Sequence, residues 1–291
     1  MSSPLQAEGA ETSPFAPGDF ADLASGSART ALLTVLGEFV WPTGTAAWTS
    51  SLLYVLGGMG IEPHTARQAI ARAAAAGWIE PARRGRAVMW SLTPAGRRIF
   101  EEGSPRVYSM SNPFSSWDGS WLILLVTIPH THRTARKKLY AGLNWAGFGN
   151  PTPGVWLSPH LERKAEVAGL IERLDLDKHT MSFTGKASDV GISVSEIVAQ
   201  GWDMATLEEH YRTVLDTLAG PLPTDQDRVL LAYVRMVGEW QRFPFSDPQL
   251  PEALLPDWIG RRTARRIEAL RAQWTEQVHT RWAQVNAGPG D

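Results

Sequence analysis

The chain has 291 residues, of which 43% are hydrophobic and 20% charged, with a net charge of −2, and this length suffices for two or three globular domains. It contains no cysteine, which excludes a disulfide framework, a thiol nucleophile and a thiolate metal site. It has neither a signal-peptide pattern nor an apolar run near the roughly 18 residues of a membrane span, so we expect a cytoplasmic protein without a membrane partner.

The charge is unevenly distributed along the chain. Residues 29–98 carry a net charge of +5, whereas residues 1–28 carry −4 and residues 99–291 carry −3. A locally basic module on a mildly acidic body is typical of a protein that contacts nucleic acid with one part only.

The N-terminal third predicts a flexible leader followed by a DNA-binding unit. Residues 1–27 are rich in Ser, Ala, Gly and Pro and show no apolar periodicity. Residues 28–103 then predict a winged helix-turn-helix domain, which consists of three helices, a hairpin and a closing helix. The first helix is expected near 29–41, where Pro42 ends it, and the second at 50–56, capped by Thr49.

The third expected helix, 63–77, has a polar face and a face of small apolar residues. The polar positions recur at helical spacing and are His64, Arg67, Gln68, Ala71 and Arg72. The opposite positions are Ala66, Ala69, Ile70 and Ala73, which allow close packing on neighbouring helices. Arg and Gln side chains presented from such a base suit the DNA major groove, where they can pair with guanine and adenine edges.

A hairpin with arginines at its tip follows the third helix. Arg83, Arg84 and Arg86 surround Gly85, and Thr93 and Pro94 are expected to begin a closing helix. A wing of this kind reaches DNA phosphates or the minor groove. A solvated helix face and a solvated turn are the alternative, but the ordered combination favours DNA binding. The predicted DNA-binding residues are Thr49, His64, Thr65, Arg67, Gln68, Arg72, Arg83, Arg84 and Arg86.

The rest of the chain predicts a linker and two further domains. Residues 104–118 are the expected linker. A β-α-β-α-β alternation in 119–192 then predicts a ferredoxin-like α/β sandwich. Its elements are expected at 121–128, 131–143, 154–157, 162–174 and 181–183. Three apolar stripes predict a helical C-terminal domain, 193–285, before a tail, 286–291. The predicted fold class is therefore α+β and multidomain.

Many short motifs along the chain resemble those of the PaaX family of bacterial transcriptional repressors. The resemblance covers almost the whole chain after Ser27. The first group of matching residues is Leu92, Thr93, Pro94, Ala95, Gly96 and Arg97, then the strand at Trp121, and then Gly147, Phe148, Gly149, Gly154, Val155, Trp156, Leu157, Ser158 and Pro159. The second group is Trp202, Asp203, Met204, Leu207, Tyr211, Arg242, Phe243, Pro244, Asp247, Pro248, Leu250, Pro251, Leu254, Leu255, Pro256, Trp258 and Gly260.

The resemblance implies an architecture and a mode of action. It implies a winged helix, a middle domain similar to CRISPR-associated endoribonucleases of ferredoxin-like fold, and a helical C-terminal domain. It also implies a homodimer on palindromic operator DNA, released by an aryl-CoA thioester effector such as phenylacetyl-CoA. No other cofactor is expected. The DNA-binding roles carry over to His64, Arg67, Gln68, Arg72, Arg83, Arg84 and Arg86.

Two groups of residues are candidates for binding the effector. Arg133, Arg136, Lys137 and Lys138 cluster at the start of an expected helix and could meet CoA phosphates, although an exposed helix face explains them as well. Trp202, Trp240, Arg242 and Trp258 could line an aromatic pocket for an acyl group, or the tryptophans could be ordinary core residues.

A metal-dependent nuclease is the alternative function, because the middle domain resembles a nuclease fold. The first strand of that domain runs into Thr127, Ile128 and Pro129, without the carboxylates that such cleavage needs. A metal site at His130 and His132, completed by His160 or His179, has no supporting spacing. We therefore expect no metal, no catalytic residue and no enzyme activity.

Overall fold

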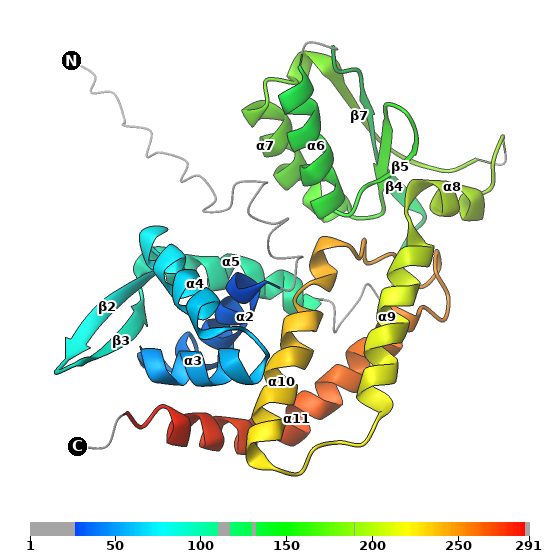
Figure 1. Cartoon of the computed structure of the whole chain (residues 1–291). Helices are drawn as coiled ribbons and strands as arrows, with labels where there is room; N and C mark the ends of the chain where they lie inside the picture. Colours follow the sequence, from blue (N-terminus) through cyan, green and yellow to red (C-terminus); the bar gives the residue numbers. More distant parts are fainter. Residues whose placement is uncertain (1–26, 110–116, 130–131, 189, 289–291) are drawn as a thin grey trace, which may run out of the picture.

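A computed structural model describes residues 27–109, 117–129, 132–188 and 190–288. The protein is a mixed α+β chain with two small antiparallel sheets (Figure 1). The predicted leader up to Gly26, the part of the predicted tail after Gly288, and His130 lie outside the described residues. Within them, no helix is both long enough and apolar enough to cross a membrane.

The N-terminal unit has the predicted order of helices and hairpin. Its elements are α2 (Ala28–Val35), η1 (Leu36–Val40), β1 (Ala47–Trp48), α3 (Thr49–Gly58), α4 (Pro63–Ala75), β2 (Ile79–Arg84), β3 (Ala87–Leu92) and α5 (Pro94–Ser109). The first predicted helix is present, but its last turns form the π-helix η1. A π-helix is rare, and single turns of it are frequent at functional sites.

The wing sheet contains one strand that the sequence did not predict. Its strand order is β1-β3-β2, with Ala47 and Trp48 of β1 paired to Trp90 and Met89 of β3. In Figure 1 the β2–β3 hairpin projects away from the helices that support it. The hairpin is therefore anchored at its base by β1 and free at its tip.

The closing helix α5 is longer than predicted. Thr93 accepts a hydrogen bond at its Oγ1 from the backbone N–H of Gly96 (3.0 Å), which confirms it as the helix cap. The helix continues to Ser109, six residues into the predicted linker 104–118. The sequence suggested a break because Pro105 lacks an N–H group and disfavours the interior of a helix.

The middle unit is a four-stranded antiparallel sheet in the order β5-β6-β4-β7. Its elements are β4 (Ser120–Val126), α6 (Arg133–Trp145), β5 (Gly149–Thr152), β6 (Val155–Ser158), η2 (Leu161–Arg163), α7 (Lys164–Arg173), η3 (Asp177–His179) and β7 (Thr180–Lys186). Five of these, β4, α6, β6, α7 and β7, match the predicted alternation, and β5 is an additional short strand before β6. Helices α6 and α7 cover one face, where Leu122, Leu139, Leu143 and Trp156 are buried together.

The C-terminal part is helical, as predicted. Its helices are α8 (Val194–Gly201), α9 (Met204–Ala219), α10 (Gln226–Trp240) and α11 (Ile259–Val285), with the short 3-10 turn η4 (Phe243–Phe245) after α10. Each of the three long helices has an apolar stripe along its length that is buried. The stripes of α9, α10 and α11 include Tyr211, Tyr233 and Trp274 respectively. Helix α8 packs instead on the middle sheet, on the face opposite α6 and α7, where Val198 lies against Trp121 and Leu157.

The N-terminal unit and the C-terminal helices share one hydrophobic core. A single cluster of buried side chains runs from α2, η1, α3 and α4 into α9, α10 and α11. Phe39 of η1 stacks on Trp282 of α11 with 4.8 Å between ring centroids. The middle unit has a separate core beneath α6 and α7. The predicted DNA-binding unit is thus packed directly against the predicted regulatory helices.

Candidate DNA-binding surface

Helix α4 presents its polar residues to solvent and buries its small residues. Ala66, Ala69, Ile70 and Ala73 are buried against α2 and α3. The side chains of His64, Thr65, Arg67, Gln68 and Arg72 are all exposed. His64 and Gln68, one helical turn apart, are joined by a hydrogen bond of 2.9 Å between Nε2 atoms. The predicted division of the helix into two faces is confirmed.

The tip of the wing is a two-residue turn. Arg84 pairs with Ala87, which leaves Gly85 and Arg86 as the turn residues. Gly85 has a φ of +58° and Arg86 does not have a positive φ, as in a type II′ turn that takes glycine at its first central position. Arg83, Arg84 and Arg86 are exposed. Three cations therefore lie within four residues at the end of a projecting hairpin.

Thr49 has a different position from the one predicted. It is the first residue of α3, not its cap, and Trp48 occupies the capping position without a side-chain bond. Its hydroxyl donates to the backbone oxygen of Val88 (3.0 Å) and accepts from Nε1 of Trp90 (2.9 Å). Both hydrogen bonds hold α3 against β3. The structure therefore uses this hydroxyl to fix the wing, which explains the residue without a DNA contact.

A buried carboxylate joins the DNA-binding unit to the C-terminal helices. Glu38 of η1 is only 8% exposed. It accepts a hydrogen bond from the hydroxyl of Tyr233 in α10 (2.6 Å) and forms an ion pair with Arg271 of α11 (3.0 Å). Burial and the neighbouring carboxylate raise the pKa of Tyr233 well above its usual value, so the phenol stays a donor.

Polar contacts from three other places reinforce this attachment. Thr34 of α2 donates to Oε1 of Gln241 (2.9 Å), and Ser51 of α3 donates to the backbone oxygen of Val285 (3.0 Å). Asn286 accepts from the backbone N–H of Trp48 (2.9 Å) and donates to the oxygen of Ala46. The position of the wing base and of α3 is thereby tied to both ends of the C-terminal bundle.

The predicted aromatic effector pocket is divided between two clusters. Trp240 is 2% exposed and Trp258 is 9% exposed, and both flank a stacked pair formed by Tyr211 and Phe243 with 3.8 Å between ring centroids. Trp202 lies instead beside Trp121 on the middle sheet, where its Nε1 donates to the oxygen of Gly147 (3.3 Å). Trp240 and Trp258 are core residues in this structure.

Asp247 organises the buried part of the Tyr211 cluster. Its carboxylate accepts from the Tyr211 hydroxyl (2.6 Å), from Nε1 of Trp258 (3.3 Å) and from the backbone N–H of Gln249 (2.6 Å). Burial is the main cause that raises the pKa of Tyr211 well above its usual value. The indole N–H of Trp258 is therefore satisfied within the core, as expected for a buried tryptophan.

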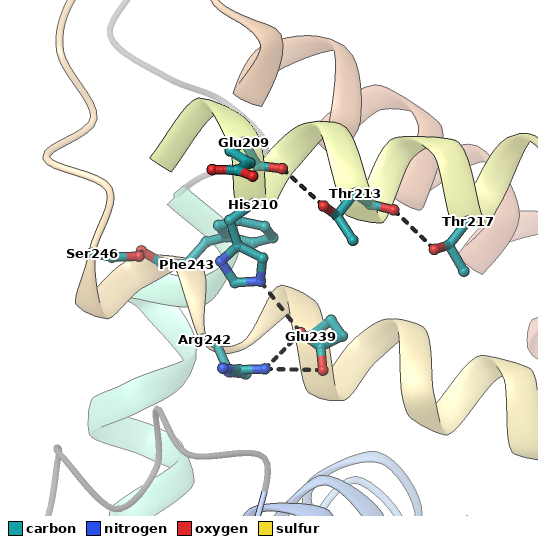
Figure 2. A network of polar contacts seen from close by, with 8 residues as sticks. All are labelled: Glu209, His210, Thr213, Thr217, Glu239, Arg242, Phe243 and Ser246. Carbon is teal, nitrogen blue, oxygen red and sulfur yellow. Dashed lines mark hydrogen bonds and ion pairs between the residues drawn. The ribbon is translucent and has the colours of Figure 1, made fainter. Parts of the chain in front are cut away.

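Arg242 belongs to a polar network at the junction of α9, α10 and η4. Figure 2 shows its guanidinium directed at Glu239, and Nη1 donates to both carboxylate oxygens (2.8 and 3.1 Å). His210 of α9 approaches the same carboxylate, with 3.5 Å between Nε2 and Oε2, and its ring lies over Phe243. Arg242, Glu239 and His210 are each only partly buried. Of the effector candidates, Arg242 meets solvent at this junction.

The basic effector candidates lie at the start of α6, the end of that helix away from Arg242. Arg133, Lys137 and Lys138 are exposed, whereas Arg136 is half-buried and donates to the backbone oxygen of Ile128 (3.0 Å). In Figure 1 the start of α6 is the end away from α10. A thirteen-residue helix is about 20 Å long. A ligand that contacted both the basic group and Arg242 would have to be elongated.

The histidines considered for a metal site occupy separate environments. The rings of His132 and His179 lie 6.1 Å apart, whereas His160 is fully buried and its Nε2 lies 2.7 Å from the oxygen of Pro248. Among the described residues, no three His, Cys, Asp or Glu side chains are grouped so that they could hold a metal ion.

The sequence did not predict that Glu38, Tyr233 and Arg271 interact. In the sequence, Tyr233 falls in the apolar stripe of one expected C-terminal helix, and Arg271 lies between the apolar positions Leu270 and Trp274 of another. The signal was a single acidic residue inside the otherwise apolar segment Leu36–Val40. A lone carboxylate on a face that must be buried requires a partner, because an unpaired buried charge is strongly unfavourable.

Three family models match the chain one after another. Residues 27–96 match "PaaX-like protein", residues 115–197 match "PaaX protein central Cas2-like domain", and residues 199–284 match "PaaX-like protein C-terminal domain". The chain belongs to the PaaX family. The PaaX match at the N-terminus includes α4 and the whole wing, and the central match includes the complete four-stranded sheet.

Two individual proteins extend the comparison. The curated protein "Transcriptional repressor PaaX" of Escherichia coli strain K12 is 25% identical over 253 residues, which are 83% of this chain and 78% of that protein. The solved structure "Uncharacterized protein Rv0674 from Mycobacterium tuberculosis" is similar with a TM-score of 0.58 and 23% identity, and the match covers 88% of this chain and 99% of that one. The second likeness concerns the fold alone.

Proposed function

We propose that this protein is a DNA-binding transcriptional repressor. The observation that supports the proposal most strongly is the common exposure of the polar face of α4 and the three arginines of the wing, in a part of the chain with a net charge of +5. The curated relative is itself named a transcriptional repressor. In this proposal 28–103 is a winged helix-turn-helix, 119–192 a ferredoxin-like domain, and 193–285 a helical regulatory domain.

The two surfaces have different tasks on DNA. Arg67 and Gln68 can form paired hydrogen bonds with base edges when α4 enters the major groove. Arg83, Arg84 and Arg86 can neutralise phosphates, a contact that contributes to affinity on any sequence and weakens with added salt. His64 and Arg72 extend the polar face toward the two ends of α4. In this proposal the protein binds operator DNA as a homodimer in the cytoplasm.

Arg67→Ala and Arg84→Ala are expected to weaken DNA binding in distinguishable ways. Arg67→Ala should cost about 1 to 3 kcal/mol on the operator and relax the preference for one base, because a base-edge contact is lost. Arg84→Ala should weaken operator and scrambled DNA alike and reduce the dependence of log K on log salt by about one, because one phosphate contact is lost. Titration of both duplexes over a salt series measures both effects.

Exposed arginines outside the proposed surface provide the control. Arg212→Ala on α9 removes a cation of the same kind, and its side chain is 58% exposed in an ion pair with Glu208. This variant should bind both duplexes like the wild type. An equal loss on operator and scrambled DNA for Arg67→Ala would contradict the proposed base contact.

A nuclease is not favoured as an alternative. The strand β4 ends at Val126 and is followed by Thr127, Ile128 and Pro129, which provide no carboxylate to hold a divalent cation beside a phosphodiester. The proposal of a non-enzymatic regulator rests on the lack of a carboxylate at this position and on the name of the curated relative. Cleavage of end-labelled DNA or RNA after addition of Mg²⁺ or Mn²⁺ would contradict it.

The proposed effector is an elongated anionic molecule such as an aryl-CoA thioester. Its phosphates would meet Arg133, Lys137 and Lys138 at the start of α6, and its acyl part would approach the partly exposed residues Arg242 and Trp202. The separation of the two groups by about the length of α6 suits such a shape. Arg136 is a poorer candidate because its guanidinium is held by Ile128.

The double variant Lys137→Glu, Lys138→Glu tests the phosphate part of this proposal. We expect release of the operator to need at least about ten times more phenylacetyl-CoA, because two attractive charges become repulsive. Operator affinity without effector should not change. Lys164→Glu on α7 is a matched exposed control. An unchanged effector concentration for release in the double variant would overturn this placement of the phosphates.

A further inference from the structure

The edge strand β7 presents apolar side chains to solvent on one face. Met181 is 59% exposed and Phe183 is 53% exposed. Their partners across the pair with β4 are Leu125 and Ile123, so all four side chains share the face of the sheet opposite α6 and α7. The face toward the helices carries Ser182 and Thr184 at this edge. The strand therefore has its apolar residues on the face away from α6 and α7, where α8 also packs but leaves Met181 and Phe183 exposed.

Further exposed apolar side chains follow the strand in the sequence. Val190, Ile192 and Val194 follow β7 on the way to α8, and Val190 is 87% exposed. Helix α8 packs on the same side of the sheet as Phe183, beside Trp121 and Leu157. Five of the eight large hydrophobic side chains that the described residues expose thus fall between positions 181 and 194. Exposed apolar side chains concentrated in one stretch of the chain are typical of an interaction site.

The outer edge of β7 has no partner strand among the described residues. The strand order β5-β6-β4-β7 places β7 at the end of the sheet, and its seven residues leave a row of backbone N–H and C=O groups on that side. Proteins normally protect such an edge with charges, prolines or a covering segment. In β7 the only charged residue is Lys186, at its end, and there is no proline.

The geometry points to a second copy of this chain as the partner of β7. Two β7 strands, antiparallel and related by a two-fold axis through Phe183, would form one continuous eight-stranded sheet. In this register the two Phe183 rings face each other, and Met181 of each copy lies opposite Gly185 of the other. A Cβ atom at Gly185 would meet no atom within 4 Å, so there is space for the methionine side chain.

The charges of β7 agree with this pairing. An antiparallel arrangement places each Lys186 opposite Thr180 of the second copy, so the two ammonium groups lie at opposite ends of the paired strands. Six residues at about 3.4 Å each separate them by roughly 20 Å, well beyond the screening length of about 8 Å at physiological salt. A parallel pairing would instead place the two lysines side by side. The inference identifies a contact surface for the homodimer and in this respect rests on the proposed function.

Cysteine cross-linking tests both the surface and the register, because the chain has no cysteine of its own. In Phe183→Cys the two new thiols would face each other with Cβ atoms about 4.5 to 5.5 Å apart, close to the range for a disulfide. Mild oxidation should give a dimer of twice 32.0 kDa on a non-reducing gel. Met181→Cys is the matched control, since it is at least as exposed but lies about 14 Å from its own copy.

A mixture of Met181→Cys and Gly185→Cys should restore cross-linking, because these positions lie opposite each other. Sedimentation of the uncross-linked protein is the second readout. The wild type should sediment as a dimer and Phe183→Asp as a folded monomer. A monomeric wild type, a dimeric Phe183→Asp, or equal cross-linking by Met181→Cys and Phe183→Cys would each overturn the inference.

DNA binding by the same samples separates this inference from the proposed function. Selective operator binding without a β7-mediated dimer would overturn only the inference. A β7-mediated dimer without any preference for operator over scrambled DNA would overturn only the proposed function.

Discussion

Glu38→Ala is expected to lower the free energy of unfolding by roughly 3 kcal/mol. The substitution removes the acceptor of the Tyr233 hydroxyl and the ion-pair partner of Arg271, and it leaves a small cavity at the contact between η1 and the C-terminal helices. The loss of a buried partner is costly because the remaining polar group has given up its water. Equilibrium unfolding in urea measures the effect.

A more exposed ion pair between α10 and α11 is the control for Glu38. Asp227 of α10 pairs with Arg281 of α11 (2.6 Å), and its side chain is 40% exposed. The pair holds the pKa of Asp227 below its usual value, chiefly through the bond from Arg281. Asp227→Asn should cost at most about 1 kcal/mol, because solvent screens exposed pairs. Equal losses for the two variants would refute the special role of burial at Glu38.

Gly96→Ala is the second substitution with a large expected effect, roughly 2 to 4 kcal/mol of stability. A Cβ atom at this position would lie 2.0 Å from the backbone oxygen of Trp78. The obstacle is main chain, so no rotamer change relieves it and α5 would have to move away from the wing base. The midpoint of thermal unfolding should fall by several degrees.

The same helix offers a control for Gly96. A Cβ atom at Gly103 would meet nothing within 4 Å, and Gly103 lies inside α5. Gly103→Ala should therefore stabilise the protein by about 0.5 to 1 kcal/mol, since alanine is the better helix former. If both variants destabilised the protein alike, general disturbance of α5 would be the cause and not the contact with Trp78.

The predictable parts of the structure are those with local signals. The apolar and polar faces of α4 follow from helical spacing, and the wing follows from Gly85 between two alternating strands, so both were predicted correctly. Strand β5 was missed because Asn150 and Pro151 are poor strand residues and only pairing with β6 holds them extended. The extension of α5 was missed because Gly103 and Pro105 usually end a helix.

The contact between the N-terminal unit and the C-terminal helices could not be predicted for a different reason. An apolar stripe on α10 has the same pattern whether it packs on α9, on α11 or on a helix two hundred residues earlier in the chain. Trp240 and Trp258 illustrate the same limit, because an aromatic residue in a pocket and one in a core look identical in sequence. The partner of each stripe is a property of the folded chain.

The shared core has a consequence for how this protein can be taken apart. A fragment ending after α5 would lose the cover of Leu36, Phe39 and Val40 and would leave the Glu38 carboxylate without Tyr233 and Arg271. Such a fragment is expected to aggregate, although its helices and wing are all present. A chimera that transfers the DNA specificity to another scaffold must therefore carry α10 and α11 with it. The N-terminal unit and these two helices must be transferred together, although the middle sheet lies between them in the sequence.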